Sequence, residues 1–246
     1  MVFITEGKRG INSLALRVIG IAAMICCLIW TYLVRGDNWV MRLNWLAFPI
    51  FAFLLVEGFN KTSMRGLYAV RLLIFAALSE VPYNMMIAKA VSFPRNQNVM
   101  FTLAAGFCCM AITEAVKNKF HNLITTGLTA FLTTWAAVWL CTNLGFEMGQ
   151  SGVIIIMIFY IASGSKYAKL WQLIGFAALT ALLASDFIAS PIIGGYRYFM
   201  PAQAFSLLAM LIIWTYNGER GPNSLGLKRT FYVVYPLTCL IIALIG

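Results

Sequence analysis

The stretch NWLAFPIFAFLLVEGFNKT, Asn44 to Thr62, decides the fold, because it places a proline and a carboxylate inside an apolar run. The run is long enough to cross a bilayer, which takes about 20 predominantly apolar residues. Glu57 would lie near one membrane face, where an ionisable group is costly and therefore a candidate for function. The next apolar segment, RLLIFAALSEVP, offers Arg71 and Glu80 as polar partners. The sequence therefore predicts a site between two helices.

Composition assigns the class of protein. Of the 246 residues, 61% are hydrophobic and only 11% are charged, and the mean hydropathy is +0.84. These values leave too little polar surface to cover a soluble globule, so we expect an all-α, polytopic membrane protein. The chain is expected to form a single transmembrane domain, residues 1–246, with a short cytoplasmic segment at 1–13 and no cleavable signal peptide.

Apolar runs predict nine membrane-spanning helices, and a count of eight or ten is the main alternative. The sixth and seventh are the shortest and are separated by only a few residues. The predicted spans are 14–34, 41–58, 68–88, 98–116, 121–141, 150–163, 168–185, 199–216 and 230–246.

The basic residues predict the orientation. Twelve of the 18 Lys and Arg residues, Lys117 and Lys166 among them, fall in the N-terminus and in every second loop, whereas five, including Arg197, fall on the other side. Arg71 is left out as intramembrane. Basic residues gather on the cytoplasmic side, so the N-terminus is predicted to be cytoplasmic. The net charge of +10 is spread over short loops and does not indicate nucleic-acid binding.

Two loops are longer than the others. Residues 184–198 contain Pro191, Gly194 and Gly195, which favour turns or a re-entrant bend over regular helix. The loop 217–228 is polar and basic, and it could bind an anionic phosphate or serve only as a cytoplasmic tether. The residues that would bind such a cofactor are Asn217, Gly218, Arg220 and Lys228.

Polar side chains that interrupt apolar runs are the candidates for a polar site: Glu57, Arg71, Glu80 and Glu147. Glu57 and Arg71 lie near the inner ends of neighbouring spans, so we expect them to pair. Glu80 lies about 13.5 Å further along the helix and should contact Asn98 or Thr102. The cysteines have no CxxC spacing and His121 stands alone, so no metal site is predicted.

Several runs, taken in order, resemble the TraX family of bacterial membrane proteins, which is similar to multi-span membrane acyltransferases. The resemblance covers the chain from about Leu14 to the C-terminus. The runs that carry it are LAFPIFAFLLVEGFNKT, RLLIFAALSEVPYN, QNVMFTLAAG, GQSGVIIIMIFY, YNGERG and FYVVYPL.

The resemblance implies transfer of an acetyl group from cytoplasmic acetyl-CoA to an acceptor in or across the membrane. It also implies an Asp-His pair in the first span, an arginine before the Phe-Pro, and a His after the last Tyr-Pro-Leu. The corresponding positions here are Cys27 and Leu28, Trp45, and Thr238. A leucine cannot move a proton and a tryptophan lacks the donors of a guanidinium. The catalytic positions are therefore expected to be replaced, which indicates a pseudoenzyme.

Three hypotheses follow. The first is a non-catalytic subunit that binds a membrane partner, in the bacterial cytoplasmic membrane. The second is an active acetyltransferase that uses acetyl-CoA on a peptide or glycan acceptor, with Cys27 as a thiol nucleophile or with Glu57 or Glu80 as a base. The third is a small-solute transporter, which the intramembrane charges suggest but no inverted repeat supports.

Overall fold

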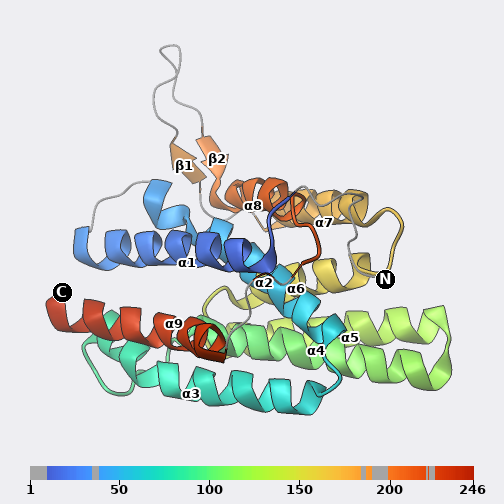
Figure 1. Cartoon of the computed structure of the whole chain (residues 1–246), viewed down its shortest axis with the longest axis horizontal. Helices are drawn as coiled ribbons and strands as arrows, with labels where there is room; N and C mark the ends of the chain where they lie inside the picture. The colour runs from blue at the N-terminus through green and yellow to red at the C-terminus, as the bar shows by residue number, and fades with distance from the viewer. Residues whose placement is uncertain (1–9, 35–38, 184–186, 190–198, 220, 222–224) are drawn as a thin grey trace, which may run out of the picture.

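The structure, a computed structural model, describes residues 10–34, 39–183, 187–189, 199–219, 221 and 225–246. Over these residues the chain is almost entirely helical (Figure 1). The α-helices of the described residues are α1 (Ser13–Ile29), α2 (Asn44–Lys61), α3 (Arg65–Ala88), α4 (Val99–Phe120), α5 (Leu123–Asn143), α6 (Gly149–Ala162), α7 (Ala168–Leu182), α8 (Phe205–Ile213) and α9 (Leu225–Ile245). A π-helical turn, Trp30–Val34, extends α1, and 3-10 turns, Trp39–Arg42 and Ala202–Ala204, precede α2 and α8.

In the described part of the chain, five helices are long and apolar enough to cross a membrane, which confirms the all-α membrane class. They are Ser13–Val34, Trp39–Lys61, Arg65–Ala88, Val99–Phe120 and Leu123–Asn143. The apolar helices of the second half are shorter: Gly149–Ala162, Ala168–Leu182, Ala202–Ile213 and Thr230–Ile245. The existence of nine helices agrees with the predicted pattern among the described residues, whereas nine complete membrane crossings stay a prediction.

The predicted eighth span was wrong at its beginning. Residues 199–201 form strand β2 (Phe199–Pro201), which pairs antiparallel with β1 (Phe187–Ala189) so that Phe187 lies opposite Pro201. The helix begins only at Phe205. A proline locks its own φ and disfavours helical backbone in the residue before it. Helix is therefore disfavoured through Met200 and Pro201, and it begins only after them. The predicted bend with Pro191, Gly194 and Gly195 lies outside the described residues.

Asparagines start three of the helices. The side chains of Asn12, Asn98 and Asn122 accept hydrogen bonds from backbone N–H groups in the first turns of α1, α4 and α5, at 2.9, 3.0 and 2.8 Å. An N-cap of this kind satisfies a backbone donor that has no partner inside the helix. Such caps fix where each helix enters the apolar layer.

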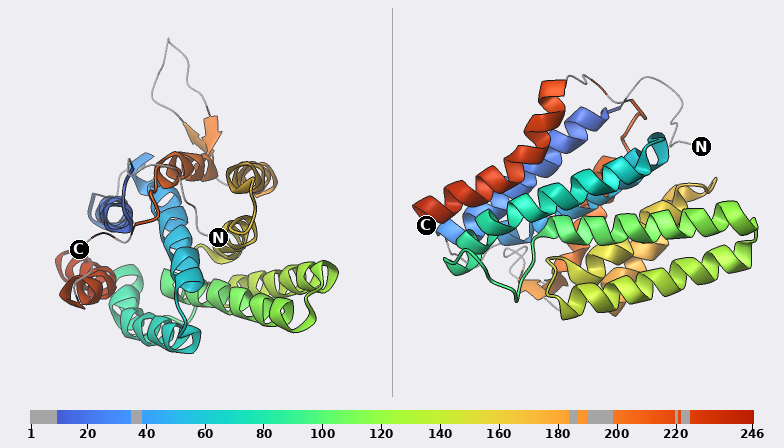
Figure 2. Two further views of the ribbon diagram at one scale, coloured as in Figure 1. Left: turned by 45° about the vertical axis from the view of Figure 1, so that its right-hand side comes forward. Right: turned by 90° about the horizontal axis from the view of Figure 1, so that it is seen from below.

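Helix α2 lies at the centre of the bundle (Figures 1 and 2) and packs against α1, α8, α6 and α4. Its rings Phe48, Phe53 and Phe59 are almost completely buried in the main core. Helix α3 packs between α4 and α9, and α4 and α5 form a hairpin that reaches beyond the other helices. The arrangement leaves α1 and α2 on one side and α3 and α9 on the other side of a shared space.

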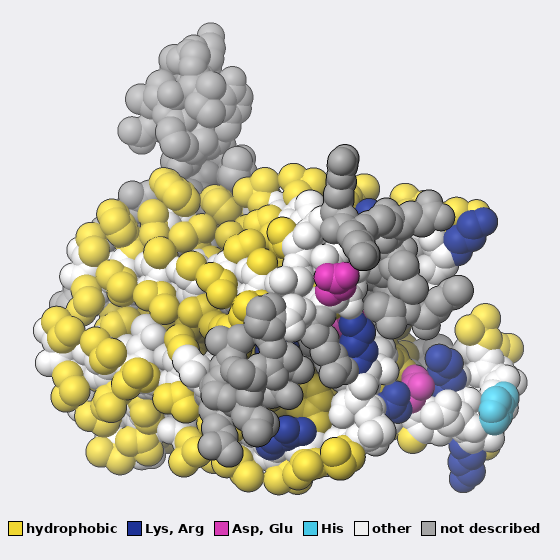
Figure 3. All heavy atoms as spheres, in the orientation of Figure 1, with side chains coloured by type: hydrophobic (Ala, Val, Ile, Leu, Met, Phe, Trp, Pro, Cys, Tyr) yellow, Lys and Arg dark blue, Asp and Glu magenta, His cyan; other side chains and the backbone are white. Residues whose placement is uncertain are grey.

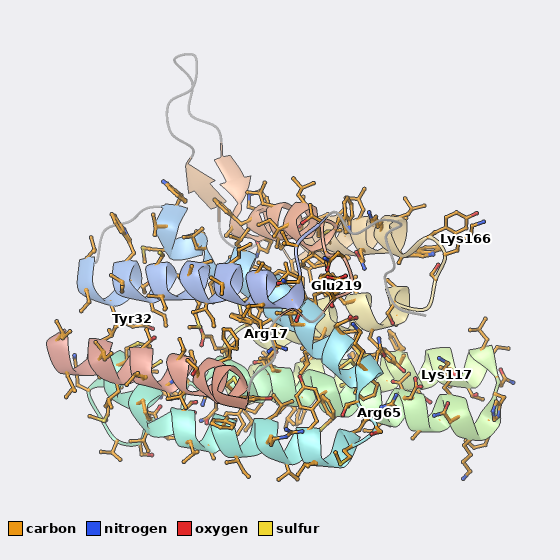
Figure 4. The ribbon with its side chains drawn as sticks, viewed as in Figure 1. Arg17, Tyr32, Arg65, Lys117, Lys166 and Glu219 are labelled. Carbon is orange, nitrogen blue, oxygen red and sulfur yellow. The ribbon has the colours of Figure 1, made fainter. Side chains whose placement is uncertain are left out.

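Charge is distributed along the long axis of the molecule. Figure 3 shows basic side chains in one half of the visible face, whereas the other half is apolar. Lys117 and Lys166 point outward at the same end (Figure 4), as the nine-span prediction requires of two residues on one side of a membrane. Arg197, predicted on the opposite side, lies outside the described residues.

Candidate functional site

A cavity of about 590 Å³ occupies the space between α1, α2, α3 and α9, and residues from α4 reach its inner part. Ser13 and Met24 both line it, and the rise along α1 from one to the other, eleven residues at about 1.5 Å each, corresponds to a depth of about 16 Å. Its outer rim is polar and includes Arg17 and Lys61. The inner walls are apolar, formed by Leu54, Leu55, Leu72, Met100 and Leu103.

Glu57 lies at this rim and pairs with a residue of its own helix. Its carboxylate is 2.5 Å from the Lys61 ammonium, one turn further along α2, and it accepts a hydrogen bond of 3.0 Å from the Tyr216 hydroxyl. The predicted pair between Glu57 and Arg71 was therefore wrong. Arg71 lines the same cavity, but its Nε donates to the Leu67 carbonyl at 3.3 Å.

The loop after α8 supports this ion pair. Lys61 donates to the Gly218 carbonyl at 2.8 Å. The Asn217 N–H donates to the Ile11 carbonyl at 3.0 Å, which ties the loop to the segment before α1. Asn217 and Gly218 thus hold the rim together, and their predicted role in binding a cofactor stays a prediction. Arg220 and the side chain of Lys228 lie outside what the structure describes.

Two arginines at the rim have no carboxylate partner among the described residues. Arg17 lies over the Phe231 ring, 5.5 Å from its centroid, and Arg71 lines the cavity from α3. Tyr68 also lines the cavity from α3. Gly58 leaves room for that tyrosine, since a Cβ at this position would lie 3.0 Å from the Tyr68 ring and hydroxyl.

Cys27, Leu28, Trp45 and Thr238 are the positions at which the family resemblance implied catalytic residues, and their replacement stays a prediction. Of the described lining residues, none is Cys27, Leu28, Trp45 or Thr238. Met24 and Tyr235 do line the cavity, one helical turn before Cys27 and Thr238, respectively. Leu28 packs in a buried cluster with Met24 and Tyr235, and Trp45 packs against the main core.

The polar groups at two of these positions are bound to backbone carbonyls. The Cys27 thiol donates to the Met41 carbonyl at 3.1 Å. The Thr238 hydroxyl donates to the Val234 carbonyl, one turn earlier in α9, at 2.8 Å. Both groups are thus used to satisfy backbone acceptors, a common role for hydroxyls inside apolar helices.

Glu147 is held in the connection between α5 and α6. Its backbone N–H donates to the Gln97 carbonyl at 2.9 Å, and its carbonyl accepts the Thr102 hydroxyl. Its carboxylate Oε1 accepts a hydrogen bond of 3.4 Å from the Asn44 amide. The connection is therefore fixed by α2 and by the residues at the start of α4.

The other oxygen of this carboxylate, Glu147 Oε2, is buried without a hydrogen-bond partner among the described residues. Burial raises the pKa of Glu147 from 4.5 to about 7, although the Val99 N–H and the Asn44 and Tyr235 side chains oppose the shift. The Tyr235 hydroxyl influences the carboxylate but lies outside good hydrogen-bond geometry. Val99 and Tyr235 also line the cavity, so two residues that act on this carboxylate form part of the cavity wall.

Glu80 has the predicted partner. Its carboxylate accepts hydrogen bonds from the Asn98 side chain at 2.5 Å and from the Asn98 N–H at 3.3 Å. Thr102, the other predicted partner, contacts Glu147 instead. Glu80 is not among the described residues that line the cavity, so the two pairs do not form one polar site.

The sequence also contained residues of the site that were not singled out. Lys61 follows Glu57 by four positions, a spacing at which helical side chains meet, and this signal could have identified the pair. Arg17 and Tyr216 carried no comparable local signal. In the part of the chain that the structure describes, no three His, Cys, Asp or Glu residues are grouped closely enough to hold a metal ion.

The fold and the cavity define a polytopic helical membrane protein with a polar-rimmed, apolar-walled internal cavity. Within that class, the chain belongs to the TraX protein family, whose sequence model matches residues 13–246. No curated protein and no solved structure matches the chain.

Proposed function

We propose that this protein is a non-catalytic member of the TraX family that acts as a binding subunit in a membrane assembly. The observation that carries the proposal is the state of the polar groups at the replaced positions. Cys27 and Thr238 donate to backbone carbonyls, and Leu28 has no polar group. Neither donor can exchange a proton with a substrate unless it first leaves its carbonyl, which would cost about 1 kcal/mol or more.

The surface of α5 supports a role in binding a membrane partner. Phe131, Trp135 and Trp139 recur every four residues, so they lie on one face of the helix, and their exposed fractions are 67%, 64% and 60%. The hydroxyls of Thr129, Thr133 and Thr134 donate to carbonyls of the preceding turn, which suits a helix in an apolar environment. Aromatic residues are enriched in protein interfaces.

Two measurements test this function together. Purified protein is incubated with radiolabelled acetyl-CoA and peptide or glycan acceptors, and we expect no transfer above that of a control without protein. Affinity purification from membranes should recover a reproducible protein partner. Trp135→Ala should lose that partner, whereas Trp171→Ala, an exposed tryptophan on α7, should retain it. Acetyl transfer by the purified parent protein would be enough to overturn the non-catalytic proposal.

One observation favours acetyl transfer as the second candidate. Glu147 has an unpartnered oxygen, and its pKa of about 7 suits a general base at neutral pH. It would accept the proton of an attacking amine or hydroxyl as the acetyl group leaves the sulfur of acetyl-CoA for that nucleophile. In this case Glu147→Gln would abolish transfer, whereas Cys27→Ala would not.

We also propose the cytoplasmic membrane of a bacterium as the location, with the N-terminus inside. The support is the number of basic residues in the N-terminus and alternate loops. In a cysteine-free background, a Lys166→Cys variant should be labelled by an impermeant reagent only after the cells are opened. Labelling in intact cells would contradict the proposed orientation.

A further inference from the structure

The cavity between α1, α2, α3 and α9 has two chemically different parts. Its described lining residues that carry a charge at neutral pH, Arg17, Glu57, Lys61 and Arg71, lie in the outer turns of their helices. Beyond them, Met24, Leu54, Met100 and Leu103 form apolar walls. A site with this division suits a ligand that has a charged head and an apolar chain.

The charge of the rim favours an anionic head. The ion pair between Glu57 and Lys61 neutralises both side chains, since their charged atoms are 2.5 Å apart. Arg17 and Arg71 remain, and neither has a carboxylate partner among the described residues. A guanidinium group has a planar set of donors that matches the geometry of phosphate. Two such groups near one mouth favour a phosphate over a single-charge carboxylate.

The size and position of the cavity favour a chain of limited length. A volume of about 590 Å³ lies within the range of about 300 to 1,000 Å³ that is usual for small-molecule sites. The depth of about 16 Å follows α1 from Ser13 to Met24. Figure 3 shows basic side chains around an apolar recess on this face, and Figure 4 places Arg17 between the layers of helices.

We propose that this cavity binds a single-chain amphiphile with a phosphate head. The phosphate lies between Arg17 and Arg71, and the chain lies along Met24, Leu54 and Leu103. Gly58 contributes indirectly, because the absence of a Cβ lets Tyr68, which also lines the cavity, pack against α2. The inference goes beyond the function proposed above, since it holds whether or not the protein transfers acetyl groups or binds a partner.

A binding experiment with the purified full-length protein tests the inference. Tritiated lauroyl lysophosphatidate is bound to immobilised protein in detergent and displaced by three unlabelled competitors. We expect lysophosphatidate to compete at least ten times better than monolauroylglycerol, which lacks the phosphate, and than glycerol 3-phosphate, which lacks the chain. The last competitor separates a lipid-type ligand from a soluble phosphate ester.

Four variants locate the site. Arg17→Gln and Arg71→Gln should each raise the dissociation constant about tenfold or more, the loss expected for a charged hydrogen bond. Arg95→Gln, the same change at an exposed arginine outside the described cavity lining, should have no effect. Leu54→Trp should abolish binding by filling the apolar part. Gel filtration and thermal unfolding identify any variant that is misfolded. Such a variant is set aside, and the binding affinities of the folded variants then decide whether the ligand occupies this cavity.

Three results would overturn the inference. Equal competition by monolauroylglycerol would show that no phosphate is recognised. Equal competition by glycerol 3-phosphate would show that the apolar walls are not used. Unchanged affinity in both folded arginine variants would place any phosphate site elsewhere. None of these results depends on acetyl transfer or on a protein partner, so a failure here is distinct from a failure of the proposed function.

Discussion

The two ends of the cavity handle polar groups in opposite ways. At the rim, Glu57 is neutralised by Lys61 and by the Tyr216 hydroxyl. At the inner end, Cys27 and Thr238 are bound to backbone carbonyls. Charge is thus retained at the rim, where a counter-charge is available, whereas the Cys27 thiol and the Thr238 hydroxyl are weak donors that the backbone can satisfy.

Glu147 is the exception at the inner end. It is a carboxylate with one oxygen that has no partner among the described residues, and the Tyr235 that lines the cavity influences it. A group of this kind is costly in an apolar environment unless it is protonated or serves a function. The comparison therefore separates a structural ion pair at the rim from Glu147, a candidate functional group behind the cavity wall.

The largest effect is expected when the ion pair at the rim is broken. Lys61→Met would leave Glu57, whose exposed fraction is only 5%, without its counter-charge. Removing one partner of a buried pair costs about 3–5 kcal/mol. We expect a large fall in the unfolding temperature of the purified protein, measured by differential scanning fluorimetry in detergent.

The double variant Glu57→Gln, Lys61→Met serves as the matched control. It removes both charges, so much of the lost stability should return. If the Lys61→Met variant were as stable as the parent protein, the ion pair between Glu57 and Lys61 would not contribute to the stability of the fold.

A pH-dependent effect is expected at the inner end. Because the folded-state pKa of Glu147 is raised from 4.5 to about 7, the folded protein binds this proton more tightly than the unfolded chain does. The resulting stability is fully present below about pH 4.5 and is lost as the pH rises through 7, with a total of up to about 3 kcal/mol. Glu147→Gln should remove this dependence and be the more stable form at pH 8.

Melting temperatures of the parent protein and Glu147→Gln at pH 5 and pH 8 check this prediction. Glu219→Gln changes an exposed residue and serves as the control. Equal pH dependence in the parent protein and Glu147→Gln would show that the carboxylate is solvated or paired, and would remove the basis for the second candidate function.

The smallest effect is expected for Thr238→Val. The hydroxyl donates only to a carbonyl of its own helix, and valine preserves its shape, so stability should change by less than about 1 kcal/mol. Ligand binding and any acetyl transfer should also be unaffected. A loss of acetyl transfer with unchanged stability would identify Thr238 as a functional group and contradict the comparison between the two ends.

Local sequence patterns predicted that the helices exist more accurately than they predicted the residues at which the helices begin. Apolar run length identified the helices from α1 to α7, and the pair of Glu80 with Asn98 followed from their depth along neighbouring helices. Residues 199–201 were predicted as helix, because their apolar composition gives no sign of the strand pairing with 187–189 that competes for the same backbone donors. An apolar composition alone cannot distinguish these two ways of satisfying the backbone.

The sequence by itself determined that this chain is a helical membrane protein of the TraX family, because hydrophobicity and motif order are local properties. Only the tertiary structure decided which polar groups meet. Glu57 had two cations within reach in the sequence, Lys61 and Arg71, and the packing of α2 against the loop after α8 selected Lys61. The cavity, too, arises from four helices distant in sequence. The burial of a side chain and the partner of a polar group depend on packing between segments distant in sequence, so no single segment encodes them.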